Sequence, residues 1–256
     1  MAISVSRVIT TEVADSIAAV RAPSLALLLY GSHARGDQAP ASDVDLLQLV
    51  PEPRKGYSEG AVSVVAYTTG QLRNMARAGS LFAWHLRSEG IILDDPNHLL
   101  EAVLGEHPGP ATDRVLARVR ELSAVLDVSH GDLDRYGPRI TRLARYLLRT
   151  AIYARSLNAG EVSFAIERAA RAAGAESKLP LLVRPADAEC FPPLASYRDA
   201  LVDVLGAPLA PNLFGSLEAL VLNRWDVDRQ LAVMAVQAMS DDAGELDYEL
   251  ITFSEL

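Results

Sequence analysis

Short apolar runs separated by turn-forming residues make up the hydrophobic pattern of the N-terminal part of the chain. Each run is shorter than a typical helix, is rich in leucine, valine or isoleucine, and is bounded by glycine, proline or aspartate. These features predict buried β-strands. The predicted strands are residues 25–30, 44–50, 61–68 and 91–95. A single loop separates the first two, so we expect them to pair as neighbours.

Hydrophobic residues at helical spacing alternate with these strands. The segments that show this spacing are residues 11–20, 68–90 and 96–104. Within the second segment, Gly79 predicts a break and Ser80 predicts the cap of a new helix. Helices and strands therefore alternate in this part of the chain, which predicts helices packed on a small sheet.

The pattern changes at residues 105–113, where glycine and proline cluster and the strand signals stop. Beyond this point, apolar residues recur every three or four positions, as in an amphipathic helix. The segments with this pattern are residues 113–128, 132–157, 163–173 and 215–239. They predict a bundle of helices.

The two patterns predict an α+β protein with two domains. We assign a small mixed-sheet domain to residues 1–108 and an all-α helical bundle to residues 109–256, with an acidic C-terminal tail. A chain of 256 residues, half of them hydrophobic, is long enough to bury a core in each domain.

Composition excludes several classes of protein. No apolar run approaches the roughly 20 residues of a membrane span, and the N-terminus lacks the pattern of a signal peptide, so we expect a cytoplasmic protein that does not bind membranes. The net charge of −9 disfavours nucleic acid as a partner, because general affinity for nucleic acid depends on lysine and arginine. The chain has 1 cysteine, which excludes a disulfide within one chain and disfavours a zinc-type ligand cluster.

The segment YGSHARGDQAPASDVDLLQLV carries the clearest chemistry. Gly31 follows a predicted strand and allows the backbone to approach a ligand closely, and Ser32 can begin a helical turn whose N–H groups point at an anion. Asp43 and Asp45 stand at alternate positions of a strand entrance, so both carboxylates emerge on the same face. A divalent cation relieves the repulsion between them, and paired carboxylates beside a phosphate site suit Mg²⁺.

Gly31-Ser32, ten intervening residues and Asp43-Val-Asp45 resemble the signature of the DNA polymerase β-like nucleotidyltransferase superfamily. The likeness is closest to the minimal and aminoglycoside nucleotidyltransferases, which join such a domain to a helical bundle. The resemblance implies that Gly31 and Ser32 hold nucleotide phosphates and that Asp43 and Asp45 hold Mg²⁺. A nucleoside monophosphate, most simply AMP from ATP, then passes to a hydroxyl group with release of pyrophosphate.

The resemblance extends to two further residues of the motif and to the substrates. It implies that Arg35 contacts a phosphate and that Ser42 supports the loop. The acidic composition favours a cationic acceptor with a hydroxyl group, such as an aminoglycoside. A hydroxyl of a partner protein, as in antitoxin-type enzymes that adenylylate a protein, stays open as the alternative. Dimers occur among relatives, so a homodimer is one expected state.

One position departs from the family pattern. Active members commonly carry a third metal-binding carboxylate near the start of the strand that follows the Asp-x-Asp strand, and Ser63 stands at that place. A serine hydroxyl is a poor replacement for a charged ligand. The sequence therefore leaves two readings open, an enzyme that manages with Asp43 and Asp45 and a nucleotide-binding module without turnover.

Proton removal from the acceptor hydroxyl requires a base, which in similar enzymes can come from the helical domain. Glu161 is the candidate, because it follows Asn158-Ala-Gly in a predicted loop between two helices. A carboxylate that caps or solvates a helix is the competing interpretation. Glu167, Asp132 and Asp134 are further candidates by location alone.

Two more features have open interpretations. Glu89 ends a predicted helix just before a strand, where support of the connection is the simplest role. Four arginines in the predicted helix over residues 132–157 share one stripe, which either faces a phosphate or an acidic partner or is a solvated face. They are Arg139, Arg142, Arg145 and Arg149.

Overall fold

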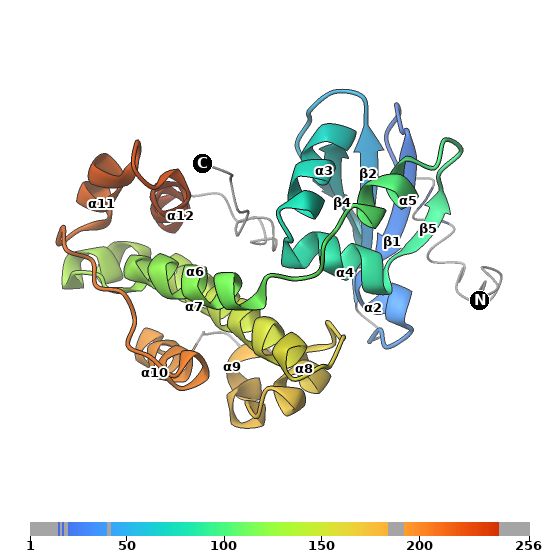
Figure 1. Cartoon of the computed structure of the whole chain (residues 1–256). Coiled ribbons are helices and arrows are strands. Elements are labelled where there is room, and N and C mark those ends of the chain that lie inside the picture. The colour runs from blue at the N-terminus through green and yellow to red at the C-terminus, as the bar shows by residue number, and fades with distance from the viewer. Residues whose placement is uncertain (1–14, 16, 18–19, 40–41, 184–191, 241–256) are drawn as a thin grey trace. The chain divides into compact units, whose positions relative to one another are not determined.

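The computed structural model describes residues 15, 17, 20–39, 42–183 and 192–240. The chain divides into two compact units, one that reaches Pro110 and one that begins at Ala111 (Figure 1). A mixed sheet lies in the first unit and helices dominate the second, so the predicted α+β class is confirmed. The helix predicted over residues 11–20 lies largely outside the described residues. Within the described ranges, no helix combines the length and the apolar character that a membrane span requires.

The N-terminal unit is built on one five-stranded sheet in the order β3-β4-β2-β1-β5. Strand β2 pairs antiparallel with β1 and parallel with β4, and the two edge strands pair antiparallel with their neighbours. All four predicted strands are present, and the short edge strand β3 was missed because turn-forming residues surround it. The strands are β1 (Ala26–Tyr30), β2 (Val44–Val50), β3 (Tyr57–Glu59), β4 (Val62–Thr68) and β5 (Ile91–Asp94).

Four helices of this unit have bounds within the described residues, and α3 and α4 pack on one face of the sheet (Figure 1). The predicted break at Gly79 is confirmed, and the Ser80 hydroxyl accepts a hydrogen bond from the backbone N–H of Ala83 to begin α4. The hydroxyl of Thr68 caps α3 in the same way, through the N–H of Gln71. The helices are α2 (Gly31–Arg35), α3 (Thr69–Arg77), α4 (Leu81–Glu89) and α5 (Leu99–Gly105).

The two faces of the sheet carry different neighbours. Tyr30 of β1 and Tyr67 of β4 both contact the ring of Phe82, so these residues point toward α4. Side chains of the opposite parity form an apolar cluster on the other face. The buried members of that cluster are Leu27, Leu29, Val44, Leu46, Val62 and Val64.

The helical unit is organised around α7, which contacts α6, α8, α10 and α12. The structure differs from the sequence prediction in that α9 and α10 were not predicted and the helix predicted over residues 215–239 is divided. Asp228 causes the division, because its carboxylate accepts a hydrogen bond from the N–H of Leu231 and starts a new helix. The helices are α6 (Thr112–Leu122), α7 (His130–Asn158), α8 (Ile166–Ala172), α9 (Leu179–Leu182), α10 (Leu194–Leu205), α11 (Leu217–Arg224) and α12 (Arg229–Met239), with short 3₁₀ turns η2 (Ser123–Leu126) and η3 (Glu176–Lys178).

The apolar residues of α7 recur at the spacing that predicted a helix, and each is buried. They are Ile140, Leu143, Leu147, Ala151 and Ile152. Burial of one such side chain stabilises a fold by about 1.5–3 kcal/mol for the larger residues. The packing of this stripe therefore holds α7 together even though Pro138 lies inside the helix.

The arginine stripe of α7 makes contacts within the helical unit. Arg139 donates a hydrogen bond to the carbonyl of Met239, the last residue of α12, and Arg145 donates to the carbonyl of Leu182, the last residue of α9. Arg149 donates to the hydroxyl of Tyr153. A cation at a helix C-terminus satisfies carbonyls that have no partner within the helix.

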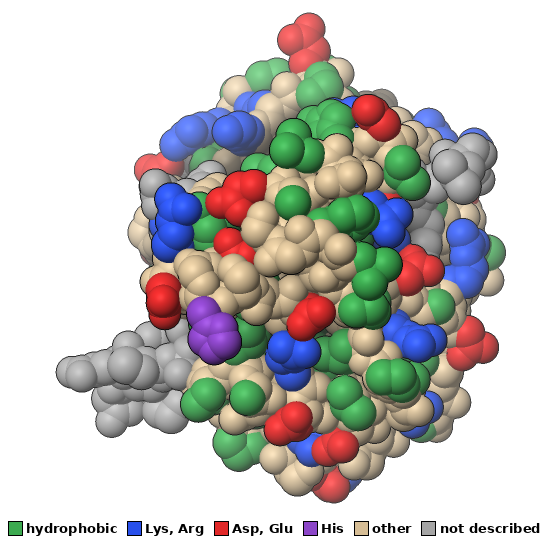
Figure 2. All heavy atoms as spheres, turned by 90° about the vertical axis from the view of Figure 1, so that its left-hand side faces the viewer, with side chains coloured by type: hydrophobic (Ala, Val, Ile, Leu, Met, Phe, Trp, Pro, Cys, Tyr) green, Lys and Arg blue, Asp and Glu red, His purple; other side chains and the backbone are tan. Residues whose placement is uncertain are grey.

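Two of the four members of the stripe, Arg139 and Arg145, bind the ends of other helices, so a purely solvated face does not describe it. On the molecular face that Figure 2 shows, basic and acidic side chains lie among hydrophobic ones.

His107 lies where the N-terminal unit ends. Its Nε2 donates to the carbonyl of Ser80 at 3.0 Å, and its Nδ1 accepts a hydrogen bond from the N–H of Gly109 at 3.0 Å. Burial, with a smaller contribution from the positive charge of Arg87, lowers the pKa of His107 below its ordinary value despite the Ser80 hydrogen bond. The imidazole is therefore neutral, and it joins α4 to the segment that leaves the unit.

This histidine makes stability depend on pH. Unfolding restores the ordinary pKa, so the contribution of neutral His107 is complete above about pH 6.5 and is lost as the pH falls below that value. We expect the thermal unfolding midpoint to decrease less between pH 7.5 and pH 5 in His107→Gln than in the wild type. His98→Gln is the control, because the His98 side chain is 80% exposed. An equal decrease in His107→Gln and the wild type would contradict the assignment.

Candidate functional site

The turn between β1 and α2 brings Asp45 against the backbone of Gly31. Gly31 has a φ of +74°, a left-handed conformation that favours glycine. A Cβ atom at this position would lie 2.3 Å from Oδ2 of Asp45. Both the backbone angle and the neighbouring carboxylate therefore require glycine here. The first residue and the last residue of the predicted motif are in direct proximity.

Asp45 stands between two neighbouring strands. Its register partner on β1 is Tyr30, and its register partner on β4 is Ser63. Paired residues of a sheet project from the same face, and Tyr30 points toward Phe82 of α4. Asp45 and Ser63 thus project from the face that α4 covers. The hydroxyl of Ser63 occupies the position beside Asp45 where the resemblance led us to expect a third carboxylate.

Asp43 lies one residue before β2 begins and is exposed. The residue before it, Ser42, closes a turn: its hydroxyl accepts a hydrogen bond from the N–H of Ala39 at 2.9 Å. The buried side chain of His33, on α2, lies with Nε2 3.2 Å from the carbonyl oxygen of Ser42. Ser42 therefore supports the loop, and His33 fixes the position from which Asp43 emerges. The sequence analysis gave His33 no such role.

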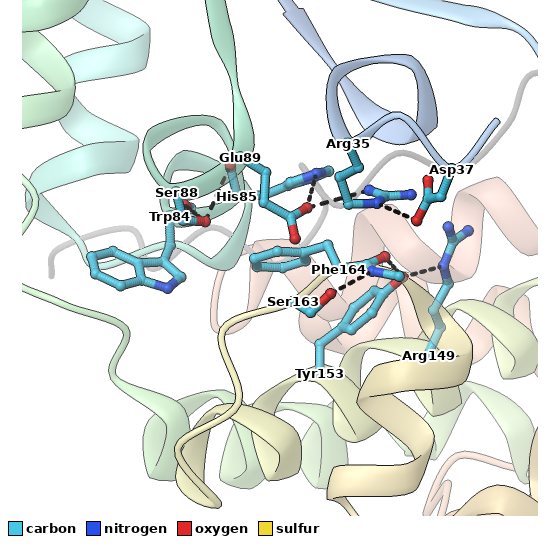
Figure 3. A network of polar contacts seen from close by, with 11 residues as sticks. Arg35, Asp37, Trp84, His85, Ser88, Glu89, Arg149, Tyr153, Ser163 and Phe164 are labelled. Carbon is cyan, nitrogen blue, oxygen red and sulfur yellow. Dashed lines mark hydrogen bonds and ion pairs between the residues drawn. The ribbon is translucent and has the colours of Figure 1, made fainter. Parts of the chain in front are cut away.

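Two carboxylates hold the guanidinium of Arg35, at the end of α2. Nε donates to Asp37 at 3.1 Å and Nη1 donates to Glu89 at 3.3 Å (Figure 3). The Arg35 side chain is 17% exposed. Burial lowers the pKa of Arg35, but the hydrogen bonds and charges of Asp37 and Glu89 outweigh this effect and leave the pKa above its ordinary value. Arg35 is a fixed positive charge.

Glu89 is the site residue that the sequence analysis did not identify. Its Oε2 lies 3.3 Å from Nη1 of Arg35 and also 3.3 Å from Nε2 of His85, one turn earlier on α4. Figure 3 shows the Glu89 carboxylate between the His85 ring and the Arg35 guanidinium. His85 in turn packs edge-on against Tyr30, with 5.8 Å between the ring centroids. A chain of contacts therefore joins α4 to both ends of α2.

The charges around α2 are mainly negative. Asp43 and Asp45 emerge beside it, and Asp37 and Glu89 pair with its Arg35. Four carboxylates thus accompany one guanidinium. Nearby anions repel one another and repel a phosphate, so an additional cation is needed for a triphosphate to bind here.

The donor atoms suit a Mg²⁺ ion that is shared with a nucleotide. The carboxylates of Asp43 and Asp45 and the hydroxyl of Ser63 offer hard oxygen atoms, and Mg²⁺ typically binds through one or two carboxylates, phosphate oxygens and water. Among the described residues, no group of three or more His, Cys, Asp and Glu side chains is placed to hold a metal ion. The oxygen atoms of these residues therefore fit a cation that is shared with a triphosphate.

The candidate bases lie in the helical unit. Glu161 is in the loop that follows α7, and the hydroxyl of Ser156 donates to its backbone carbonyl at 3.4 Å. Asp132 has a structural role instead: it is buried, and its carboxylate accepts a hydrogen bond from the N–H of Leu217 at the start of α11. Glu167 lies in the first turn of α8 and is exposed, like Asp134 on α7. Glu161 is the candidate that stands outside a helix.

Comparison with known proteins gives a family match over part of the chain. Residues 17–80 match the family model described as a nucleotidyltransferase domain. The matched segment includes the motif from Gly31 to Asp45, together with Ser63, and it ends before Glu89. Comparison with curated proteins finds no match. The match supports the nucleotidyltransferase superfamily for this segment and supports nucleotidyl transfer as its general chemistry.

The contact between Gly31 and Asp45 gives a prediction with an internal control. Gly31→Ala combines a left-handed backbone, which costs about 1–2 kcal/mol for alanine, with displacement of the Asp45 carboxylate. Gly36→Ala meets a similar φ of +76° with nothing within 4 Å of its Cβ. We expect both changes to lower the free energy of unfolding in urea, Gly31→Ala more strongly. Only Gly31→Ala should also weaken Mg²⁺-dependent nucleotide binding. Equal effects of the two changes on binding would disprove the role of this contact.

Proposed function

We propose that this protein is a Mg²⁺-dependent nucleotidyltransferase that moves a nucleoside monophosphate, AMP from ATP, to a hydroxyl group of a small molecule. A cationic acceptor such as an aminoglycoside suits the net charge of −9. The family match to residues 17–80 supports the general reaction. The nucleotide, the metal and the acceptor are parts of the proposal.

The observation that carries the proposal is the position of the Asp45 carboxylate against the Gly31 backbone. Because Gly31 has no side chain, the Asp45 carboxylate lies directly against the turn, and a cation held by that carboxylate would lie close to phosphate oxygens bound at the turn. Ser32 follows directly and offers a hydroxyl and an N–H group to the same ligand. A cation bound by Asp43 and Asp45 would then contact the triphosphate.

Metal and guanidinium have complementary roles in this reaction. When bound, Mg²⁺ would neutralise charge on the phosphates and polarise the phosphoryl group. Arg35 adds a permanent positive charge, and its Nη2 makes no hydrogen bond to any residue that the structure describes, so this atom can donate to a phosphate oxygen. Without the metal, the negative charges of Asp43 and Asp45 would repel the phosphates, so binding of the triphosphate requires the metal.

The reaction is a substitution at the α-phosphorus of the nucleotide. The acceptor oxygen forms a bond to phosphorus, the bond from phosphorus to the bridging oxygen breaks, and pyrophosphate leaves with that oxygen. The proton of the acceptor hydroxyl passes to a base, for which we propose the carboxylate of Glu161.

A nucleotide-binding module without turnover is the second candidate function. Ser63 beside Asp45 is the observation that favours it, because the hydroxyl supplies no negative charge to a second metal ion. The two candidates differ in whether pyrophosphate is released, and not in whether the triphosphate binds.

Calorimetric titration with a non-hydrolysable ATP analogue tests the triphosphate site. We expect the wild type to bind the analogue in the presence of Mg²⁺ and to lose at least tenfold in affinity when Mg²⁺ is removed. Asp43→Asn combined with Asp45→Asn should abolish the Mg²⁺-dependent part of the affinity for the analogue, because the double change removes both charged ligands. Asp94→Asn with Asp95→Asn, at the end of β5, is the control with the same loss of charge. Absence of binding by the wild type would refute the proposed function.

Pyrophosphate release tests catalysis and the role of Glu161. With ATP, Mg²⁺ and a panel of aminoglycosides, we expect acceptor-dependent release of pyrophosphate by the wild type. Glu161→Gln should lower kcat by about 10²–10⁴-fold without changing the affinity for the nucleotide, as expected for a general base. Glu167→Gln, in the neighbouring helix, is the control. Binding of the analogue without pyrophosphate release by any acceptor would favour the second candidate.

A further inference from the structure

The Glu89 carboxylate contacts two side chains that come from different elements, Arg35 on α2 and His85 on α4. One oxygen, Oε2, lies 3.3 Å from Nη1 of Arg35 on α2 and 3.3 Å from Nε2 of His85 on α4. The side chains of Glu89, Arg35 and His85 are 11%, 17% and 4% exposed, respectively. Surface ion pairs are weak because water screens them, whereas this group is largely removed from water. The contact thus constrains the guanidinium strongly.

The backbone around Glu89 is as constrained as its side chain. A Cβ atom on the next residue, Gly90, would lie 2.3 Å from the carbonyl oxygen of Leu86 and 2.9 Å from the side chain of Leu28. Glycine therefore allows the end of α4 to approach β1 closely. Because β1 leads directly into Gly31, the carboxylate of Glu89 has a defined position relative to the turn between β1 and α2.

A metal-binding role for Glu89 does not fit these contacts. Its carboxylate faces the guanidinium of Arg35 and the ring of His85. Simple support of the connection to β5, the role that its place in the sequence suggested, does not account for the contact with α2. The contact with Arg35 lets Glu89 control the orientation of the guanidinium.

We propose that Glu89 is a positioning residue, which holds Arg35 in the orientation that binds the nucleotide phosphates. This inference rests on the proposed nucleotidyltransferase function. Glu89 and Asp37 bind Nη1 and Nε, so two atoms of the planar guanidinium are fixed and its plane is set. The third nitrogen, Nη2, is then presented in one direction. An arginine without these partners would lose side-chain freedom only when the ligand binds, which weakens binding.

The experiment is a double-mutant cycle with Glu89→Gln and Arg35→Gln. The readout is the dissociation constant of a non-hydrolysable ATP analogue with Mg²⁺, measured by calorimetry. We expect Glu89→Gln to weaken binding about tenfold in the wild type and less than twofold in the Arg35→Gln background, because a residue that acts through Arg35 has no effect without it. A residue with a merely structural role would weaken binding by the same factor in both backgrounds.

The control is Glu106→Gln, which removes another carboxylate that two arginines share in the same unit. Glu106 accepts hydrogen bonds from Arg73 at 3.1 Å and from Arg77 at 2.6 Å on α3. This change should leave the dissociation constant within twofold of the wild-type value. Glu89→Asp, which keeps the charge, takes the place of Glu89→Gln in the cycle if thermal unfolding shows that Glu89→Gln does not fold.

The outcomes separate this inference from the proposed function. Equal factors in the two backgrounds, or no effect of the Glu89 change on wild-type binding, overturn the positioning role while the proposed function stands. Failure of the wild type to bind the analogue overturns the proposed function and with it the role of Glu89. A loss of affinity on changing Glu89 that is larger in the wild type than in the Arg35→Gln background supports both the positioning role and the proposed function.

Discussion

The N-terminal unit depends on a close approach between a main chain and a carboxylate. The Asp45 carboxylate occupies the space that a side chain on Gly31 would need, at the point where β1 ends and α2 begins. The short helix that follows this turn ends at Arg35, and Arg35 lies within hydrogen-bonding distance of Glu89. The site is therefore a consequence of backbone geometry at one glycine, to which the charged side chains are added.

Around that contact, electrostatics and packing have separate tasks. Carboxylates gather at α2 and create a need for cations, while the buried histidines fix positions: His33 holds the carbonyl of Ser42, and His85 lies between Tyr30 and Glu89. Rigid support of this kind lowers the cost of ordering a charged site when a ligand binds. The helical unit uses some of its charges differently, since Arg139 and Arg145 of α7 bind the ends of other helices.

Local features of the sequence predicted most of the fold and the centre of the site. The four longer strands and the break at Gly79 follow from short-range patterns, and the spacing between Gly31 and Asp45 reflects a turn and a loop of defined length. Glu89 was not predicted, because 54 residues separate it from Arg35 and no local pattern reports such a pair. The partners of the α7 arginines were missed for the same reason. Glu89 before Gly90 was a usable signal, since a carboxylate beside a glycine that permits close packing is held in a defined place.

The hydrogen bond from Arg139 to Met239 has a consequence for biosynthesis. These residues are 100 positions apart, so α7 leaves the ribosome long before the carbonyl that Arg139 binds has been made. The helical unit cannot complete its hydrogen bonds while the chain is being translated through α8, α10 and α11. The sheet-containing unit precedes it and can fold first. A ribosome stalled before Met239 would therefore present a folded N-terminal unit attached to an unfinished helical one.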